Sequence, residues 1–251
     1  MLEVRAVSRH FGGIRAVDGV SMAVRRGEIV GLIGPNGAGK TTLFNLVAGT
    51  AKPSAGEIVL AGRRIEGEAA HRRLARGLGR TFQIPRPFPH MTLIENLLVA
   101  APGQTGERML ANWFRARVVT KEEHRNLDRA LSLLDFVTLA KLADEPARVL
   151  SGGQRKLLEL ARVMMANPAI VLLDEPAAGV NPSLAETIIA RIAELNRQGV
   201  TFLIIEHDMD LVARLCAHVF VMAGGRNLAE GTPAEVVRDP RVIEAYLGGG
   251  G

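Results

Sequence analysis

The chain has 251 residues, of which 47% are hydrophobic and 23% are charged, a composition that excludes an intrinsically disordered protein. Its 31 lysine and arginine residues exceed its 26 acidic residues by a formal charge of +5, too small an excess for a protein that coats nucleic acid. The single cysteine, Cys216, excludes a disulfide framework and any multi-cysteine metal site. The apolar runs are short and the N-terminus carries several charges, so we expect neither a membrane span nor a signal peptide.

Alternating apolar and polar residues predict short antiparallel strands in the first quarter of the chain. These segments are residues 2–8, 21–24 and 57–60. Residues 28–33 differ, because nearly all of them are apolar, which is typical of a central strand covered on both faces. This strand runs into a glycine-rich loop and then into a predicted helix over residues 40–48, which Gly49 ends.

The second half of the chain adds two buried strands, predicted from the apolar runs at 170–173 and 200–205. Residues 184–195 between them carry isoleucine and leucine at helical spacing. A strand, a glycine loop and a helix, followed by a strand–helix–strand unit, predict an α/β fold with a parallel sheet. Residues from about 91 to 162 carry leucines three and four positions apart and predict a mainly helical insertion.

The loop after the first buried strand matches the phosphate-binding pattern G-x-x-x-x-G-K-[ST]. Its residues, called the phosphate loop below, are Gly34, Pro35, Asn36, Gly37, Ala38, Gly39, Lys40, Thr41 and Thr42. Glycines let backbone N–H groups turn toward a phosphate, and the helix start adds partial positive charge. We expect Lys40 to lie between β- and γ-phosphates and the Thr41 hydroxyl to bind Mg²⁺. The alternative is a glycine-rich turn that only joins a strand to a helix.

The predicted buried strand at 170–173 is followed by two adjacent carboxylates, Asp174 and Glu175. The carboxyl ends of parallel strands share one edge of the sheet, so both side chains should project toward the phosphate loop. Asp174 would hold the magnesium ion through its coordinated water, and Glu175 would polarise the water that attacks the γ-phosphate. Alternatively, a solvated acidic pair simply ends the strand.

Residues 150–154, Leu-Ser-Gly-Gly-Gln, form a second candidate anion site, called the signature segment below. Ser151 is a favourable N-cap, and the residues after it, Gly152, Gly153 and Gln154, open an uninterrupted helical stretch. We therefore expect an N-capped helix with an open N-terminus. One ATP does not need two such helix starts from a single subunit.

The phosphate loop, the signature segment, Asp174–Pro176 and His207 together resemble the nucleotide-binding subunit of an ABC transporter, over nearly the whole chain and in the family's order. The resemblance implies a P-loop NTPase fold: a parallel-sheet core, an N-terminal antiparallel β subdomain and a helical insertion. It implies one nucleotide-binding domain over residues 1–251. Residues 1–90 and 163–251 would form a RecA-like core with the antiparallel part, and about 91–162 the helical subdomain.

The same resemblance implies ATP and Mg²⁺ as cofactors and a second ATP-binding subunit, identical or related, packed head to tail. The phosphate loop of one subunit and Ser151–Gln154 of the other would enclose each ATP. Phe11 would stack on adenine, Gln83 would link the γ-phosphate and metal to the helical part, and His207 would contact the γ-phosphate. Residues 178–181 would communicate between the two sites. Without the family, His207 is more typical of a structural histidine and Gln83 of a surface amide.

Several stretches narrow the resemblance to subunits that serve branched-chain amino-acid uptake. They are residues 81–83, 88–96, 174–182, 205–209 and 231–247. This type implies integral-membrane permease subunits, a solute-binding protein as an indirect partner, no nucleic acid, and a peripheral location on the cytoplasmic face of the inner membrane. Relatives that serve urea uptake or lipopolysaccharide export share much of the pattern, so both remain alternatives. A nucleic-acid-linked ABC ATPase is more remote, because the chain lacks coiled coils and zinc modules. A P-loop kinase or GTPase has no use for the signature segment.

A transport subunit that has no membrane-spanning segment must bind a subunit that has one. The stiff, proline-rich segment after Gln83 carries apolar candidates for this contact, namely Ile84, Pro85, Pro87, Phe88, Pro89 and Met91. By resemblance, this region receives a short cytoplasmic helix of the permease. The alternative is that Phe88 and Met91 fold back into the helical insertion.

Overall fold

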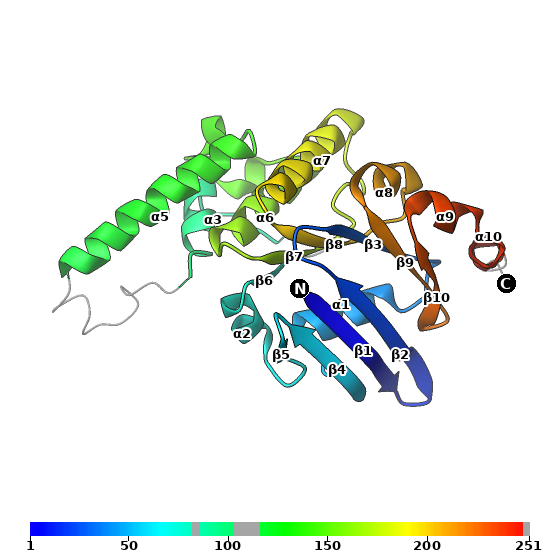
Figure 1. Cartoon of the computed structure of the whole chain (residues 1–251). Helices are drawn as coiled ribbons and strands as arrows, with labels where there is room; N and C mark the ends of the chain where they lie inside the picture. Colours follow the sequence, from blue (N-terminus) through cyan, green and yellow to red (C-terminus); the bar gives the residue numbers. More distant parts are fainter. Residues whose placement is uncertain (82–85, 103–115, 248–251) are drawn as a thin grey trace. The chain divides into compact units, whose positions relative to one another are not determined.

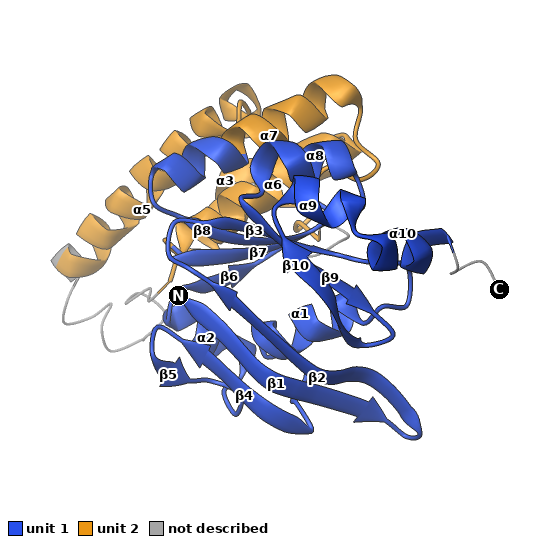
Figure 2. Ribbon diagram, turned by 45° about the vertical axis from the view of Figure 1, so that its right-hand side comes forward, with its two compact units in different colours: residues 1–83, 168–176, 192–251 blue, residues 84–167, 177–191 orange. Residues whose placement is uncertain are grey.

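A computed structural model describes residues 1–81, 86–102 and 116–247. The chain divides into two compact units, drawn in blue and orange in Figure 2. Unit 1 comprises residues 1–83, 168–176 and 192–251, and unit 2 comprises residues 84–167 and 177–191. Within the described ranges, no helix combines the length and apolar character needed to cross a membrane.

Unit 1 contains a four-stranded antiparallel sheet in the order β2-β1-β4-β5 (Figure 1). Its strands are β1 (Leu2–Phe11), β2 (Ile14–Val24), β4 (Ala55–Leu60) and β5 (Arg63–Arg64). The side chains of Leu2 and Val4 are buried on one face of β1, as the predicted alternation requires, and a β-bulge between Val4 and Val7 precedes the next buried residue, Val7. β1 and β2 join in a tight hairpin, in which Phe11 lies opposite Ile14.

Unit 1 also contains a six-stranded sheet in the order β10-β9-β3-β8-β7-β6. Its strands are β3 (Ile29–Ile33), β6 (Leu78–Arg80), β7 (Ile170–Asp174), β8 (Thr201–Ile205), β9 (His218–Ala223) and β10 (Arg226–Gly231). All neighbours are parallel except the edge pair β9 and β10. Every residue of β3, β7 and β8 is buried, which confirms the three predicted buried strands.

Helix α1 joins the two sheets in one hydrophobic core. It covers Lys40–Ala48, as predicted, and Gly49 ends it in the left-handed conformation with a φ of 81°. Its buried Leu43, Phe44 and Val47 belong to the same core cluster as residues of both sheets. Burying one such side chain fully stabilises the fold by roughly 1.5–3 kcal/mol. The other helices of unit 1 are α2 (Ala70–Ala75), α8 (Met209–Leu215), α9 (Pro233–Arg238) and α10 (Pro240–Leu247).

Arg73 of α2 holds the C-terminal end of α1. Its side chain is fully buried and donates hydrogen bonds to the carbonyls of Leu46 (2.6 Å) and Val47 (2.7 Å). It also donates to the carbonyls of Glu66 and Glu68. Burial lowers the pKa of Arg73, and the carbonyls at the negative end of the α1 dipole compensate its charge. The helix that follows the phosphate loop is therefore fixed at its far end.

Unit 2 is helical in its described parts. It contains α3 (Leu93–Leu98), α5 (Ala116–Phe136), two short 3₁₀ helices (Ala140–Leu142 and Ala147–Val149) and α6 (Gly152–Met165). Helix α7 (Pro182–Arg197) begins in unit 2 and ends in unit 1. Helix α5 contacts both α3 and α6, and its Ala130 and Leu134 are fully buried. The leucine spacing thus predicted helices correctly, although Leu127 and Leu131 are exposed rather than buried.

Candidate nucleotide-binding site

The phosphate loop depends on glycine at three positions. Gly34, Gly37 and Gly39 have φ values of 147°, 77° and 95°. Residues that carry a side chain rarely adopt these backbone conformations. A Cβ atom at Gly34 would lie 2.0 Å from the carbonyl oxygen of Met222, and one at Gly39 would lie 2.2 Å from that of Ala16. Position 37 is open to space, so conformation alone requires glycine there. The loop can only close around an anion if these residues lack side chains.

The N-terminus of α1 keeps its backbone donors for a ligand. Its N-cap is Gly39, which has no side chain to accept a hydrogen bond, and the first turn carries no acidic residue. The first N–H groups of an α-helix have no partner within the helix, and they lie at the positive end of its dipole. Such an arrangement is suited to binding a phosphate group.

Lys40 lies within the phosphate loop and is almost completely buried. Its Nζ donates hydrogen bonds to the carbonyl oxygens of Gly34 (2.6 Å) and Pro35 (2.9 Å). Burial lowers the pKa of Lys40, and the negative charges of Glu175 and Asp174 oppose that effect. The loop's own carbonyls therefore hold the ammonium group inside the phosphate loop.

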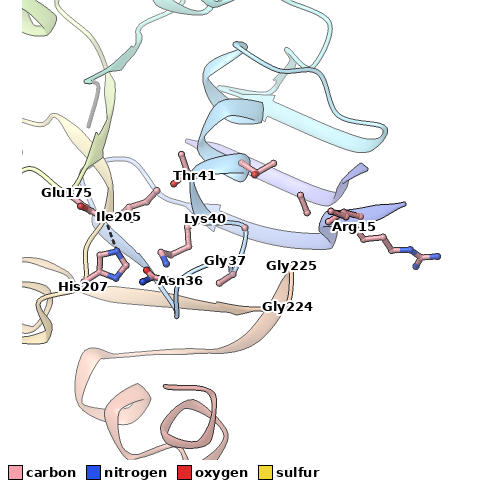
Figure 3. A pocket seen from close by; sticks show the side chains of 15 residues that line it. Arg15, Asn36, Gly37, Lys40, Thr41, Glu175, Ile205, His207, Gly224 and Gly225 are labelled. Carbon is pink, nitrogen blue, oxygen red and sulfur yellow. Dashed lines mark ion pairs between the residues drawn. The ribbon is translucent and has the colours of Figure 1, made fainter. Parts of the chain in front are cut away.

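A cavity of about 480 Å³ brings the phosphate loop together with Glu175 and His207 (Figure 3). Cavities of this size hold small-molecule ligands. Its lining residues are Ile14, Arg15, Ala16, residues 36–42, Glu175, Ile205, His207, Gly224 and Gly225. Two segments that complete the wall were not predicted from the sequence: residues 14–16 at the start of β2, and the turn at Gly224 and Gly225 between β9 and β10. Gly224-Gly225 is a recognisable hairpin signal, whereas nothing in residues 14–16 marks them as lining a cavity.

Glu175 reaches the cavity from an unusual backbone conformation. It directly follows β7 with a φ of 49°, and its N–H donates to the carbonyl of Ile205 at 3.0 Å. A left-handed conformation at a residue other than glycine costs on the order of 1–3 kcal/mol and is concentrated at functional sites. The Oε1 atom of Glu175 lies 2.8 Å from Nε2 of His207, as the dashed line in Figure 3 shows. The two side chains therefore form one acid–imidazole unit at the carboxyl end of the sheet.

Asp174 ends β7 and is 3% exposed. Burial raises its pKa, and the nearby positive charge of Arg80 opposes the increase. Oxygen atoms of Asp174 and of the Thr41 hydroxyl are the hard ligands that Mg²⁺ prefers. Among the described residues no group of three or more His, Cys, Asp or Glu side chains could hold a metal ion. A donor set of one hydroxyl and one carboxylate is compatible with Mg²⁺, which commonly combines one or two protein ligands with phosphate oxygens and water.

Phe11 ends β1 and is 49% exposed. The guanidinium carbon of Arg9 lies 4.6 Å from the centre of its ring. Phe11 is not among the residues that line the cavity, and Ile14 and Arg15 across the hairpin are. Its contact with adenine stays a prediction. Gln83 lies outside the described residues, so its predicted role also remains untested.

The signature segment lies in unit 2 and starts α6. Ser151 caps the helix as predicted, with its Oγ accepting a hydrogen bond from the N–H of Gln154 at 3.4 Å. The Gln154 side chain accepts one from the N–H of Ser151 at 2.9 Å. The expected open N-terminus was therefore wrong in part, because this reciprocal capping box occupies two backbone donors. A Cβ atom at Gly153 would lie 2.2 Å from the Leu184 side chain, whereas position 152 is open to space.

Comparisons with known proteins agree with these features. A family model described as ABC transporter matches residues 17–178, and one described as branched-chain amino acid ATP-binding cassette transporter matches residues 226–251. The chain is 43% identical to the high-affinity branched-chain amino acid transport ATP-binding protein BraF of Pseudomonas aeruginosa, over 99% of this chain and 98% of that protein. It is 41% identical to the probable branched-chain amino acid transport ATP-binding protein LivG of Archaeoglobus fulgidus, over 99% of this chain and 95% of that protein.

The fold is also that of solved ATP-binding cassettes. A crystal structure of the ADP conformation of an ATP-binding cassette of an ABC transporter superimposes with a TM-score of 0.86, at 39% sequence identity. The superposition covers 99% of this chain and 98% of that one. The chain therefore belongs to the ABC transporter family, as an ATP-binding subunit of the branched-chain amino-acid type.

Proposed function

We propose that this subunit hydrolyses ATP to power the uptake of branched-chain amino acids through a membrane permease. The observation that carries the proposal is the cavity in which Lys40 and the open start of α1 face the Glu175–His207 pair. It combines a phosphate cradle with a carboxylate that can act on water. The cargo is supported by the names of the relatives, two of which are branched-chain amino acid transport proteins over nearly their full length.

The phosphate loop would bind the β- and γ-phosphates through its N–H groups and Lys40. Phe11 would stack on the adenine ring, with Arg9 on one face of the phenyl group and the base on the other. Thr41 and Asp174, with Gln83, would hold Mg²⁺ beside the phosphates. Bound Mg²⁺ neutralises charge on the phosphate oxygens.

Glu175 would orient and polarise the water that attacks the γ-phosphate. The 2.8 Å contact with His207 fixes the direction of the carboxylate, and the imidazole also lines the cavity, where it would contact the γ-phosphate. The left-handed backbone of Glu175 serves the same purpose, because it sets where the side chain leaves the strand.

A second ATP-binding subunit would complete each site. Ser151, Gly152, Gly153 and Gln154 of one subunit would face the nucleotide on the other, and ATP would draw the two subunits together. Support comes from the contrast within one chain, which has an open phosphate cradle in unit 1 and a separate, self-capped helix start in unit 2. Residues 1–90 and 163–251 would act as the RecA-like core, with about 91–162 as the helical subdomain.

The contact with the permease would lie on unit 2, at Phe88 and Met91. Both side chains are exposed, which argues against the alternative that they fold back into the helices. The buried amide of Asn96 holds this loop, accepting from the N–H of Phe88 (2.8 Å) and donating to the carbonyls of Phe88 (3.0 Å) and Met91 (3.2 Å). Arg162 stacks on the Phe88 ring at 5.3 Å. A rigid apolar loop of this kind suits a permease helix at the cytoplasmic face of the membrane.

Transport in proteoliposomes tests the proposal directly. The subunit is reconstituted with its permease and solute-binding protein, and ATP-driven uptake of leucine is compared with uptake of urea. We expect leucine uptake with the native chain, and a loss of at least about 10²–10³-fold in hydrolysis with Glu175→Gln, which keeps ATP binding. Glu3→Gln, a surface change, serves as the control. Urea uptake alone, or recovery of the subunit with lipopolysaccharide-export proteins, would overturn the cargo and leave the ATPase standing.

Phe88→Asp tests the docking surface in the same vesicles. A charge in an apolar contact should uncouple the subunit, so that ATP hydrolysis continues while leucine uptake falls. Leu74→Asp places the same charge at an exposed apolar residue of unit 1 and should transport normally. Normal uptake by the Phe88 variant would remove this surface from the proposal.

A further inference from the structure

Arg80 is a buried arginine that no predicted role accounts for. It is the last residue of β6, paired with Leu172 of the adjacent β7, and its side chain is only 12% exposed. Burying a guanidinium group is costly unless charged or polar partners compensate it. The partners of Arg80 therefore indicate why the residue lies there.

Two of its partners lie on α1 and β7, the elements that carry Thr41 and Asp174, two of the proposed magnesium ligands. Nη1 of Arg80 donates a 2.7 Å hydrogen bond to Oδ1 of Asn45, on α1. Nη2 lies 3.8 Å from Oδ2 of Asp174, at the end of β7. Asn45 follows Thr41 by four residues, so both side chains lie on the same face of α1. One guanidinium group thus spans the helix that presents Thr41 and the strand that presents Asp174.

We propose that Arg80 is a positioning residue for the magnesium site, holding the Asp174 carboxylate at a fixed distance from the Thr41 face of α1. The inference rests on the proposed function, because it takes Thr41 and Asp174 as the metal's protein ligands. The charge of Arg80 lies 3.8 Å from the Asp174 carboxylate, while its hydrogen bond to Asn45 fixes the guanidinium from α1. A branched, planar guanidinium can hold one group by a hydrogen bond and face another with its charge, whereas a lysine ammonium is a point charge.

If Arg80 had only a structural role, its removal would have different effects. An arginine that only stabilised the sheet would, when removed, lower the melting temperature and weaken nucleotide binding with and without metal. A positioning role predicts a selective effect, in which the metal dependence changes and metal-free binding does not. Outer partners of metal ligands typically change metal affinity by about 10- to 100-fold when they are replaced.

The experiment is a binding titration on the full-length chain. A ribose-labelled fluorescent ATP analogue is bound first in EDTA and then with increasing MgCl₂. For Arg80→Met we expect the Mg²⁺ concentration at half-maximal enhancement to rise by about tenfold or more. The dissociation constant in EDTA should change by less than about threefold, because the phosphate loop is untouched. Arg76→Met is the matched control, since Arg76 is also ion-paired in unit 1, with Glu68, and should leave the Mg²⁺ dependence unchanged.

Two further variants make the test decisive. Asn45→Ala removes the 2.7 Å contact but keeps the charge pair, so it should shift the Mg²⁺ dependence in the same direction by less. It also carries the test if Arg80→Met does not fold. In an Asp174→Asn background, Arg80→Met should add nothing, because the two residues act through one carboxylate. Additive losses, or an unchanged Mg²⁺ dependence in both Arg80→Met and Asn45→Ala, would overturn the inference alone. A native chain that binds the analogue without any Mg²⁺ dependence would overturn the proposed metal site itself.

Discussion

Helices α1 and α6 both begin at glycine-containing motifs, yet their first turns are built in opposite ways. The N-cap of α1 is Gly39, which offers no side chain to the backbone donors. The N-cap of α6 is Ser151, and its capping box with Gln154 satisfies two of them. A helix start can thus be kept open for an anion or closed by its own chain. In this protein the open start lies beside Lys40, and the closed one has only glycines between its two capping residues.

The difference indicates that the two helix starts have different roles in nucleotide binding. The first turn of α1 needs a ligand to satisfy its donors, so it gains most from phosphate binding. The first turn of α6 is already stable by itself, so it can contribute to a neighbouring subunit's nucleotide without depending on it for folding. Four experiments would break or sharpen this comparison.

The largest expected effect is on nucleotide binding at the open start. Lys40→Ala deletes a charge that would contact phosphate. Because a hydrogen bond to a charged group contributes about 1.5–3 kcal/mol, we expect the binding of a fluorescent ATP analogue to weaken by about 10- to 100-fold. Thermal stability should not fall, because burial of the ammonium is itself unfavourable, as the lowered pKa of Lys40 indicates. Lys52→Ala, a change at an exposed lysine, is the control and should leave binding unchanged. Unchanged affinity in the Lys40 variant would mean that the backbone donors of α1 act alone.

The second effect concerns the two glycines of the closed start. Gly153→Ala would drive a Cβ atom to 2.2 Å from the Leu184 side chain and 2.7 Å from that of Val180. Overpacking of this kind costs about 1–3 kcal/mol, so the urea midpoint of unfolding should fall. Gly152→Ala is the matched comparison, because its Cβ meets open space, and it should be neutral or stabilising by up to about 1 kcal/mol. Equal effects in the two variants would contradict the close packing at position 153.

Much of this architecture could be predicted from the sequence where local patterns are strong. The largely apolar runs ending at Ile33, Leu173 and Ile205 form the buried strands β3, β7 and β8. Helix α1 begins and ends at the residues expected, because Gly39 and Gly49 mark both ends. Glu175 lines the same cavity as the phosphate loop, as expected of a residue at the carboxyl end of a parallel strand.

The parts that could not be predicted depend on long-range packing. Strands β9 and β10 were not predicted from the sequence, and β6 is only three residues long. Arg80 looks like any surface arginine in sequence, since only the register of β6 beside β7 brings it to Asp174. The capping box of α6, in contrast, was readable from the serine and glutamine three residues apart, and expecting an open start overlooked it.

The third experiment removes the N-terminal capping hydrogen bond of α6. Ser151→Ala deletes the hydroxyl that accepts from the Gln154 N–H, and loss of an N-cap typically costs about 0.5–2 kcal/mol of unfolding free energy. Binding of the ATP analogue by a single chain should stay unchanged, because the phosphate loop belongs to unit 1. Lys40→Ala and Ser151→Ala therefore predict reciprocal results, one affecting binding and the other stability. A Ser151 variant with native stability would mean that Gln154 alone closes the turn.

The smallest expected effect concerns α9. Its N-terminus has a capping box like that of α6, with Glu235 in the place of Gln154. The Glu235 carboxylate accepts from the N–H of Thr232 at 2.8 Å and from its hydroxyl at 2.8 Å, and these hydrogen bonds lower its pKa. The stabilisation is therefore complete above the unfolded pKa of about 4.5 and is lost as the pH falls through the lower folded value. Glu235→Gln should lower the melting temperature slightly at neutral pH, with the difference from the native chain shrinking on acidification. Gln154→Glu should give α6 the same acid sensitivity, since its box then contains a titrating group. Melting curves with parallel pH dependence in all three chains would show that these carboxylates are not bound to the helix starts in solution.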